Sequence, residues 1–512
     1  MSLIPNLGEN GALSLAGRAL WRILAPGQHG RQHGALLQRG PPAPKAARQA
    51  RAGAWWGAEP RWFPAGTPPR LHNRVTPLID GASYFAALHR ALAEAQHYAY
   101  IIGWCLTPYI PIARADGAAL RETRLLPLLA QVAQHVPVRI LLWAGAPVLF
   151  QPSTRYAEEV QATIERAGGL LQCRLDRSAH FTHCHHQKAI VVDGRVAFLG
   201  GMDLTSYTAD RWDTPAHPLR AGQNWHDAQL QIEGEAVADV EQNFRQRWEA
   251  TTGDAGLPHQ APPCDPAWRQ PVQVLRTIPA RTYAFAPDGE FGILHWYGQA
   301  LRRAQRLIYL ENQYLWSPHI MRALLAALEA PRPAPFRIVL VLPAFAGDGR
   351  WDNDKHVDQL RKADRGRGIV SIYALFASGP NAGARAFSYR SIYVHAKLAI
   401  IDDEWLVAGS ANLNNRGLIT DGEMDAAVLD PALARQMRIR LWAEHLGMSE
   451  AAVAARDPVD LVDHEWAPRA AANAEIIRQG VHPLIGAVHS YVVGHEAGSL
   501  LLEELQSLTF EI

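Results

Sequence analysis

The sequence predicts an α/β fold: a duplicated α/β sandwich in which two similar lobes each hold a mixed sheet flanked by helices. Helical patterns alternate with short apolar strands along the chain, which is typical of this class. The chain also repeats itself, because ALAEAQHYAYII at 91–102 resembles ALRRAQRLIYLE at 300–311, an offset of 300 − 91 = 209. A similar pair, VRILLW at 138–143 and FRIVLVL at 336–342, predicts one buried strand in each half.

The repeat divides the chain into five expected segments. These are a basic N-terminal arm (1–70), a first lobe (71–250), a Pro- and Gly-rich linker (251–271), a second lobe (272–447) and a C-terminal extension of unknown role (448–512). In the arm, seven Lys or Arg residues up to Arg51 accompany a single acid, Glu9. Residues 13–24 could form an amphipathic helix that lies in a membrane interface or docks on the protein's own core. Both interpretations stay open.

The overall composition is that of a globular protein, with 512 residues, 48% hydrophobic and 19% charged. A net charge of +1 argues against a global field for nucleic acid, and four cysteines without a CxxC pair argue against a disulfide framework. The sequence has no apolar run of 18 residues and no secretory layout at its start. We therefore expect a cytoplasmic protein or one peripheral to a membrane, with non-classical export left open. A monomer without a cofactor is expected.

Two copies of one motif carry the chemistry. The first copy, HHQKAIVVDGRVAFLGGMDL, supplies His186, Lys188, Asp193, Gly201 and Asp203. The second, VHAKLAIIDDEWLVAGSANL, supplies His395, Lys397, Asp402, Ser410 and Asn412. The offset is again 395 − 186 = 209, and each Asp follows its His by seven residues. His and Lys two residues apart share one face of a strand, where imidazole and ammonium suit an anionic phosphate. The glycines and Ser410 permit a tight turn whose backbone N–H groups approach that phosphate.

Two other interpretations compete for these residues. They could be ordinary residues of core strands, but the shared spacing at the repeat offset argues strongly against chance. The tract His183, Cys184, His185 and His186 could hold a metal ion. It lacks the spaced pairing of a zinc module, and Lys188 would repel a cation, so we expect no metal.

The motifs resemble those of the phospholipase D superfamily, and the resemblance covers roughly residues 70 to 450. RWDTPAHPLR (211–220), NWHDAQLQIEGEAVADVEQNFRQRW (224–248), IYLENQYLWS (308–317), GSANLNNRG (409–417) and LWAEHLG (441–447) are similar to the eukaryotic, especially plant-type, core. Nothing in the sequence resembles the C2, PX or PH domains of those relatives. Calcium dependence of the plant kind is therefore not implied.

The resemblance implies a role for each motif residue in one active site between the lobes. His186 would be the nucleophile that forms a phosphohistidine, and His395 the general acid and then base. The phosphate would be held by Lys188, Lys397 and Asn412, with Ser410 and Gly201 beside it. Asp227 and Glu423 would orient the imidazoles, and Asp193 and Asp402 would organise the motif loops. Asp203 stands where many members have Asn, and it would repel phosphate unless a lysine compensates.

The activity implied is hydrolysis of the distal phosphodiester of glycerophospholipids to phosphatidic acid and a head-group alcohol, with transphosphatidylation. The expected partner is a phospholipid membrane surface, and nucleic acid is not expected. The alternatives are a nuclease, for which a basic cluster exists at Arg361, Lys362, Arg365 and Arg367, and a cardiolipin-synthase-like transferase. A membrane-binding pseudoenzyme is disfavoured because both HxK pairs are intact. Delivery of the protein as a toxin stays open.

Overall fold

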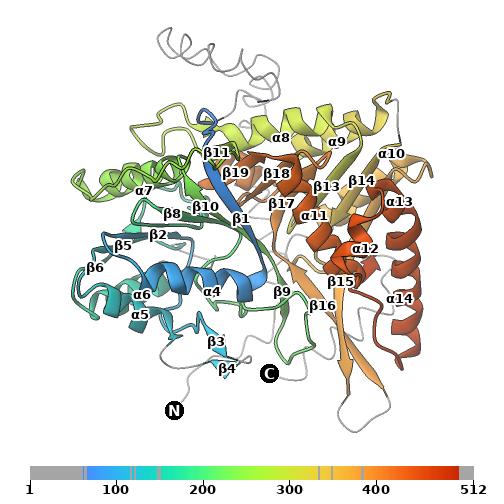
Figure 1. Cartoon of the computed structure of the whole chain (residues 1–512), viewed down its shortest axis with the longest axis horizontal. Coiled ribbons are helices and arrows are strands. Elements are labelled where there is room, and N and C mark those ends of the chain that lie inside the picture. Colours follow the sequence, from blue (N-terminus) through green and yellow to red (C-terminus); the bar gives the residue numbers. More distant parts are fainter. Residues whose placement is uncertain are drawn as a thin grey trace.

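The computed structural model describes Trp62 and residues 66–115, 118–119, 123–146, 151–332, 335–347, 350–381 and 386–494. Two large mixed sheets lie side by side in this part of the chain, each flanked by helices (Figure 1). This arrangement confirms the predicted fold class.

The first sheet belongs to the first half of the chain. Its seven strands run in the order β1 (Asn73–Ile79), β10 (Ala228–Gly234), β8 (Val196–Gly200), β7 (Ala189–Val192), β2 (Ala99–Gly103), β5 (Val138–Trp143) and β6 (Leu171–Asp176). Its helices are α4 (Asp80–Ala93), α5 (Leu125–Val132), α6 (Thr154–Glu165) and α7 (Val237–Thr252). β3 (Arg114–Ala115) and β4 (Ala118–Ala119) pair antiparallel in a separate two-stranded sheet.

The second sheet is larger and takes one strand from the first half. Its order is β12 (Glu290–Phe291), β11 (Val272–Ile278), β19 (Glu423–Leu429), β18 (Trp405–Gly409), β17 (Lys397–Ile401), β13 (Leu307–Asn312), β14 (Arg337–Val341), β15 (Val370–Pro380), β16 (Phe387–Val394) and β9 (Asn224–His226), with β20 (Val488–Ser490) paired to β15. Its helices are α8 (Gly292–Arg303), α9 (Pro318–Glu329), α10 (Arg350–Asp364), α11 (Pro431–Leu446), α12 (Glu450–Ala454), α13 (Pro458–Leu461) and α14 (Ala467–Gln479), with π-helical turns at Arg416–Thr420 and Val462–Trp466. Because β9 pairs with β16, the two halves interlock.

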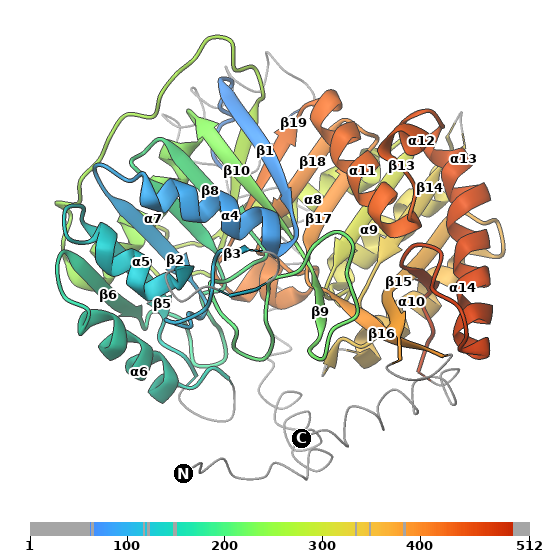
Figure 2. The same cartoon turned by 60° about the horizontal axis from the view of Figure 1, so that its bottom comes forward.

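Three hydrophobic cores stack across the molecule. α4, α5 and α6 cover the outer face of the first sheet, and α8, α9 and α10 cover the outer face of the second. The central core joins the inner faces of both sheets with α7 and α11. Figure 2 shows α4, α5 and α6 on one flank of the molecule and α11 to α14 on the other. The buried apolar layer between the sheets holds the two motifs in a fixed relation.

The sequence repeat survives in the strand register. In the first sheet Ala99 pairs with Val192, and in the second Ile308 pairs with Ile401. Each residue of the second pair follows its counterpart in the first pair by 209 positions (308 − 99 = 209 and 401 − 192 = 209). The two halves are therefore copies of one strand arrangement.

In each sheet the motifs lie at one end of the strands, and we call this end of the sheets the motif edge. Lys188 directly precedes β7, and Lys397 begins β17. β2 and β13 run antiparallel to these strands, so their carboxyl ends lie at the motif edge. β5 and β6 run parallel to β2, and β14 runs parallel to β13, so they end there too. The connections that leave these strands therefore surround the motifs.

The predicted helix at residues 13–24 lies outside the described residues, as does the chain after residue 494. At the start of the described part, Arg70 bridges to Val272 of β11. The C-terminal extension packs on the second half, where β20 pairs with β15. In the described ranges, every helix is too short or too polar to cross a bilayer.

Candidate active site

Each motif histidine is paired with a carboxylate from the other half of the chain. Nδ1 of His186 lies 2.9 Å from Oε1 of Glu423, which begins β19. Nδ1 of His395 lies 2.7 Å from Oδ2 of Asp227, which directly precedes β10. A backbone hydrogen bond also links the two halves here, because the His186 N–H donates to the carbonyl of Gly422 at 2.8 Å. The two motifs therefore form one centre.

These hydrogen bonds determine which ring nitrogen is available. Because Nδ1 of each imidazole donates to its carboxylate, Nε2 is left for another group. The side chains of His186 and His395 retain exposed fractions of 15% and 11%, so the rings can be reached. Burial lowers the pKa of both histidines well below the usual range, and the nearby lysines lower it further. Both rings are therefore neutral near pH 7 in the free protein.

The two lysines are buried and have different neighbours. Nζ of Lys188 lies 3.0 Å from Oδ2 of Asp203 and donates to the carbonyl of His186 at 2.6 Å. This ion pair supplies the compensation that an acid at position 203 requires. Nζ of Lys397 donates to Oε1 of Gln313 at 3.1 Å, and burial lowers the pKa of Lys397 below its usual value. The centre thus has one lysine neutralised by an acid and one beside a neutral amide.

Gly201 and Ser410 lie beside the two pairing carboxylates. A Cβ atom at Gly201 would lie 2.1 Å from Oδ1 of Asp227, so only glycine fits next to that side chain. Ser410 is fully buried, and its hydroxyl donates to Oε2 of Glu423 at 2.5 Å. Asn412 is also buried, and within the described chain its Oδ1 has no hydrogen-bond partner.

Asp193 and Asp402 lie at the far end of β7 and β17 from the histidines. Each has a φ of 57° and accepts backbone N–H groups at the start of a neighbouring strand. Asp193 accepts from residues 96–98, and Asp402 from residues 305–307. These contacts also follow the offset of 209.

A stack of side chains beside His395 was not singled out from the sequence. The guanidinium of Arg211 lies 4.0 Å above the ring of Trp225, and that ring lies 4.8 Å from the imidazole of His395. Arg211 is buried, and its charge lowers the pKa of His395. The RWDT and NWHD blocks contain both residues, but a local pattern does not show that they meet.

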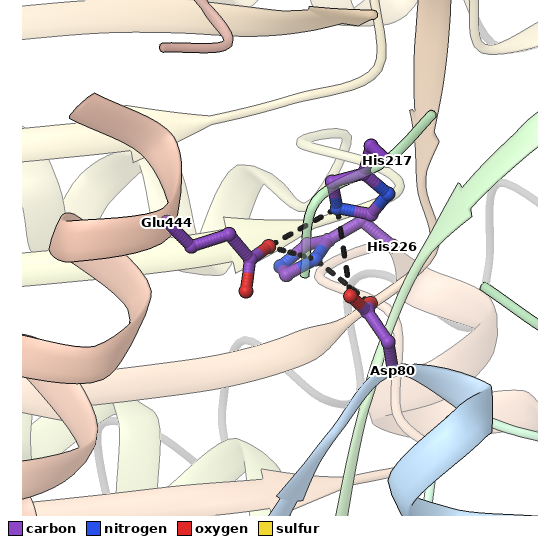
Figure 3. A group of neighbouring side chains, drawn as sticks. All are labelled: Asp80, His217, His226 and Glu444. Atoms are coloured by element: carbon purple, nitrogen blue, oxygen red, sulfur yellow. Dashed lines mark hydrogen bonds and ion pairs between the residues drawn. The ribbon is translucent and has the colours of Figure 1, made fainter. Parts of the chain in front are cut away.

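Four buried side chains next to the centre could hold a divalent cation. They are Asp80, His217, His226 and Glu444, and their donor atoms lie within 4.8 Å of one another (Figure 3). Nδ1 of His226 lies 3.1 Å from both Oδ1 of Asp80 and Oε1 of Glu444. Nε2 of His217 lies 3.5 Å from Oδ2 of Asp80 and 3.1 Å from Oε1 of Glu444. Two imidazoles and two carboxylates suit a four-coordinate ion such as zinc, whereas calcium takes six to eight oxygens.

The second ring nitrogens of this group are held by further carboxylates. Nδ1 of His217 lies 3.2 Å from Oδ2 of Asp213, and Nε2 of His226 lies 2.8 Å from Oε2 of Glu311. Such support is usual for histidines that bind metal. The metal site weighed as an alternative from the sequence lies elsewhere, at residues 183–186, and this group was not predicted.

This buried group holds the backbone next to the centre in place. The N–H of Asp80 donates to the carbonyl of Asp227 at 2.9 Å, and the N–H of Asp227 donates to Oδ1 of Asp80 at 3.2 Å. The N–H of His395 donates to the carbonyl of His226 at 2.8 Å. The group therefore fixes the backbone that carries the Asp227–His395 pair, and the reaction at the imidazoles needs no contact with it.

Comparison with known proteins supports the same grouping. Residues 91–224 match the phospholipase D domain model, and residues 297–443 match a model described as a cardiolipin synthase, phospholipase D-like domain. Phospholipase D A of Dictyostelium discoideum is 26% identical over 74% of this chain and 36% of its own length. Phospholipase D alpha 4 of Arabidopsis thaliana is 25% identical over 73% of this chain and 66% of its own length. The chain thus spans less than two thirds of these relatives.

A solved structure shares the fold. Phosphatidylserine synthase of Haemophilus influenzae superposes with a TM-score of 0.51 at 12% sequence identity, over 90% of this chain and 98% of its own. The two domain matches fall on the two halves that the repeat defines, and the named relatives cover both. The chain belongs to the phospholipase D superfamily of phosphodiesterases.

Proposed function

We propose that this chain is a phospholipase D, which hydrolyses the distal phosphodiester of glycerophospholipids to phosphatidic acid and a head-group alcohol. One observation supports the proposal above the others. The crossed pairs His186–Glu423 and His395–Asp227 bring two neutral imidazoles and two lysines to one centre. That set provides a nucleophile, an acid–base group and charge stabilisation for a phosphodiester.

In the first step, Nε2 of His186 attacks phosphorus and the bond to the head-group oxygen breaks. His395 gives the leaving oxygen a proton from its Nε2. The negative phosphate and the partner carboxylate Asp227 favour the protonated form of that ring once substrate is bound. Lys188, Lys397 and the amide of Asn412 hold the non-bridging oxygens. The product of this step is a phosphohistidine and a free alcohol.

In the second step, water attacks phosphorus and His395 takes the proton that water loses. The N–P bond breaks, phosphatidic acid leaves, and Glu423 again holds the neutral ring of His186. An alcohol in place of water gives transphosphatidylation by the same path. Ser410 and Gly201 act here by shaping the sites of Glu423 and Asp227, and Asp193 and Asp402 hold the strands that present the motifs.

Transfer to an alcohol is the second candidate for the main reaction. The second half matches a model described as a cardiolipin synthase domain, and the fold is shared with a phosphatidylserine synthase. A nuclease has less support, because part of the basic cluster is engaged within the protein. Arg361 donates to the carbonyl of Tyr491 and Arg367 pairs with Glu329.

The test is product analysis by mass spectrometry after incubation with phosphatidylcholine vesicles and ethanol. We expect phosphatidic acid, choline and phosphatidylethanol from the wild-type protein and none from His186→Ala. Conversion to phosphatidylethanol alone would favour the transferase. Intact lipid together with nucleotides released from added DNA would contradict a lipid substrate.

A further inference from the structure

Exposed apolar side chains concentrate on the motif edge. The described chain has eight large hydrophobic residues that are exposed. Six lie on that side of the molecule: Tyr109, Phe181, Phe345, Trp351, Val481 and Ile485. The other two, Leu71 and Leu170, precede β1 and β6 at the opposite edge. The four aromatic side chains of the eight are all on the motif side.

In the first half, two aromatic residues lie on the connections that leave the first sheet at its motif edge. Tyr109 lies on the connection that follows β2. Trp104 is the first residue of that connection, and the centroid of its ring lies 6.0 Å from that of the His186 ring. Phe181 lies between β6 and the first motif, five residues before His186 (186 − 181 = 5), and the residue is 62% exposed. Both residues therefore lie on connections that leave the first sheet on the side of the first histidine.

In the second half, Phe345 and Trp351 follow β14, and Trp351 is 71% exposed. The start of α10 is tied to the centre, because Oδ1 of Asn353 accepts the N–H of Leu315 at 2.7 Å. Leu315 comes two residues after Gln313, which contacts Lys397. These two aromatic residues thus lie on the connection that leaves the second sheet on the side of the second motif.

The remaining two residues lie beside a projecting hairpin. The last pair between β14 and β15 is Val341 with Tyr373, so β15 continues past the motif edge (Figure 1). There its partners among the described residues are β16 and β20. The segment that follows α14 (Ala467–Gln479) is attached to this hairpin. The N–H of Leu484 donates to Oγ of Ser378 at 3.1 Å, which places Val481 and Ile485 beside it.

A hollow beside Trp351 has the charge pattern of a zwitterionic head group. Its volume is about 630 Å³, and it is lined by Trp351, Asp354, Lys355, Asp358, Gln359, Lys362 and Val493. Within the described residues, no hydrogen bond or ion pair engages Lys355, Asp358 or Lys362. The lysines can meet a phosphate, and the Trp351 ring and an aspartate can meet a quaternary amine.

We propose that this motif-edge face is the surface by which the protein docks on a phosphatidylcholine bilayer, with its aromatic side chains entering the interface. The inference rests on the proposed function, since a lipid substrate must reach His186 from a bilayer. Aromatic side chains favour the head-group level of a membrane, and exposed apolar patches mark interaction sites. Because the aromatic side chains lie on both lobes, docking through them would bring the active site to the lipid head groups.

The test compares two double variants of exposed residues. Phe181→Ala/Trp351→Ala removes aromatic groups from the motif edge, and Leu71→Ala/Leu170→Ala removes apolar groups from the opposite edge. Binding to sucrose-loaded phosphatidylcholine vesicles is measured by sedimentation at high ionic strength, where adsorption through the basic arm is screened. The His186→Ala background prevents turnover of the vesicles. Activity of the two variants with an intact His186 is measured in parallel on a monomeric short-chain phosphatidylcholine.

We expect the motif-edge variant to bind vesicles roughly tenfold or more weakly, from the apolar area lost, and to keep its activity on the soluble substrate. The control variant should match the parent in both assays. Equal vesicle binding by the two variants, or no binding by the parent, would overturn the docking surface. A change in self-association measured by sedimentation velocity, with vesicle binding intact, would overturn it in favour of a protein interface. If the parent and both variants show no activity on the short-chain phosphatidylcholine while their vesicle binding still differs, the result would count against the proposed function alone.

Discussion

Nδ1 of His395, in the second half of the chain, lies 2.7 Å from Oδ2 of Asp227, in the first half. The matching bond joins His186 of the first half to Glu423 of the second. Neither half therefore holds a complete histidine–carboxylate pair of its own. Duplication has produced one centre with two unequal imidazoles, and several consequences can be measured.

The crossing predicts that each motif is indispensable. His186→Ala and His395→Ala should each reduce turnover of a phospholipid to background while the melting temperature stays near that of the parent. Steady-state assays with differential scanning calorimetry would measure both. Retention of about half the activity in each single variant would indicate two independent sites and contradict one shared centre.

The carboxylates should act through the rings that they orient. Asp227→Asn should lower kcat by roughly 10² to 10⁴ with little change in KM, because an amide favours the wrong tautomer of His395. The loss in the rate of the first step should be smaller for a substrate with a good leaving group, since that step then needs little protonation. The rate of alcohol release in the first turnover measures this on the two substrates, and an equal loss on both would assign Asp227 a purely structural role.

Gly201 should be required for the position of Asp227. A methyl group there would lie 2.1 Å from Oδ1 of Asp227, so Gly201→Ala must displace that side chain and should lower kcat about 10²-fold. Gly298→Ala is the matched control, because a Cβ at that helical position would have no atom within 4 Å apart from its chain neighbours and its own helix backbone. The control should keep its kcat, and its melting temperature should not fall, since alanine favours a helix more than glycine does. Normal kcat in Gly201→Ala would contradict the close packing.

The pH profile follows from the burial of His186 and Lys397. A protonated imidazole cannot attack phosphorus, and the pKa of His186 lies well below 6.5. On a p-nitrophenyl phosphodiester, kcat/KM should therefore stay level as pH falls through 6.5 and decline only at lower pH. Burial also lowers the pKa of Lys397, so the alkaline decline should begin below the usual lysine value of 10.5.

Lys397→Arg tests the alkaline limb of that profile, because a guanidinium keeps its charge to higher pH. The residual activity of this variant should persist further into the alkaline range. An acid limb centred on 6.5 in the parent would show that His186 has an ordinary pKa.

Local pattern was enough for the fold and the repeat, because strand periodicity and the offset of 209 are properties of the chain itself. The register of Ala99 with Val192 and of Ile308 with Ile401 follows that offset. The carboxylate partners do not, since Asp227 follows His186 by 227 − 186 = 41 residues and Glu423 follows His395 by 423 − 395 = 28. The connections differ in length, so the repeat alone could not assign which carboxylate meets which ring.

The buried group around His226 could not be seen from spacing. Asp80 and Glu444 are 444 − 80 = 364 residues apart, and each is unremarkable in its own segment. Only the pairing of β1 with β10 and the packing of α11 bring them together. The apolar motif edge is hidden for a related reason, because exposure of Phe181 and Trp351 depends on which connections leave that edge.

The most direct test of the account is the site of the covalent intermediate. The p-nitrophenolate group of a p-nitrophenyl phosphodiester leaves without a proton donor. The His395→Ala protein should therefore still form the phosphohistidine, but hydrolyse it slowly. Quenched samples digested under alkaline conditions, where phosphohistidine survives, can be mapped by mass spectrometry. We predict a phosphoryl adduct on His186 in the His395→Ala protein and none in His186→Ala. An adduct on His395 with His186 unmodified would contradict the assignment of the nucleophile.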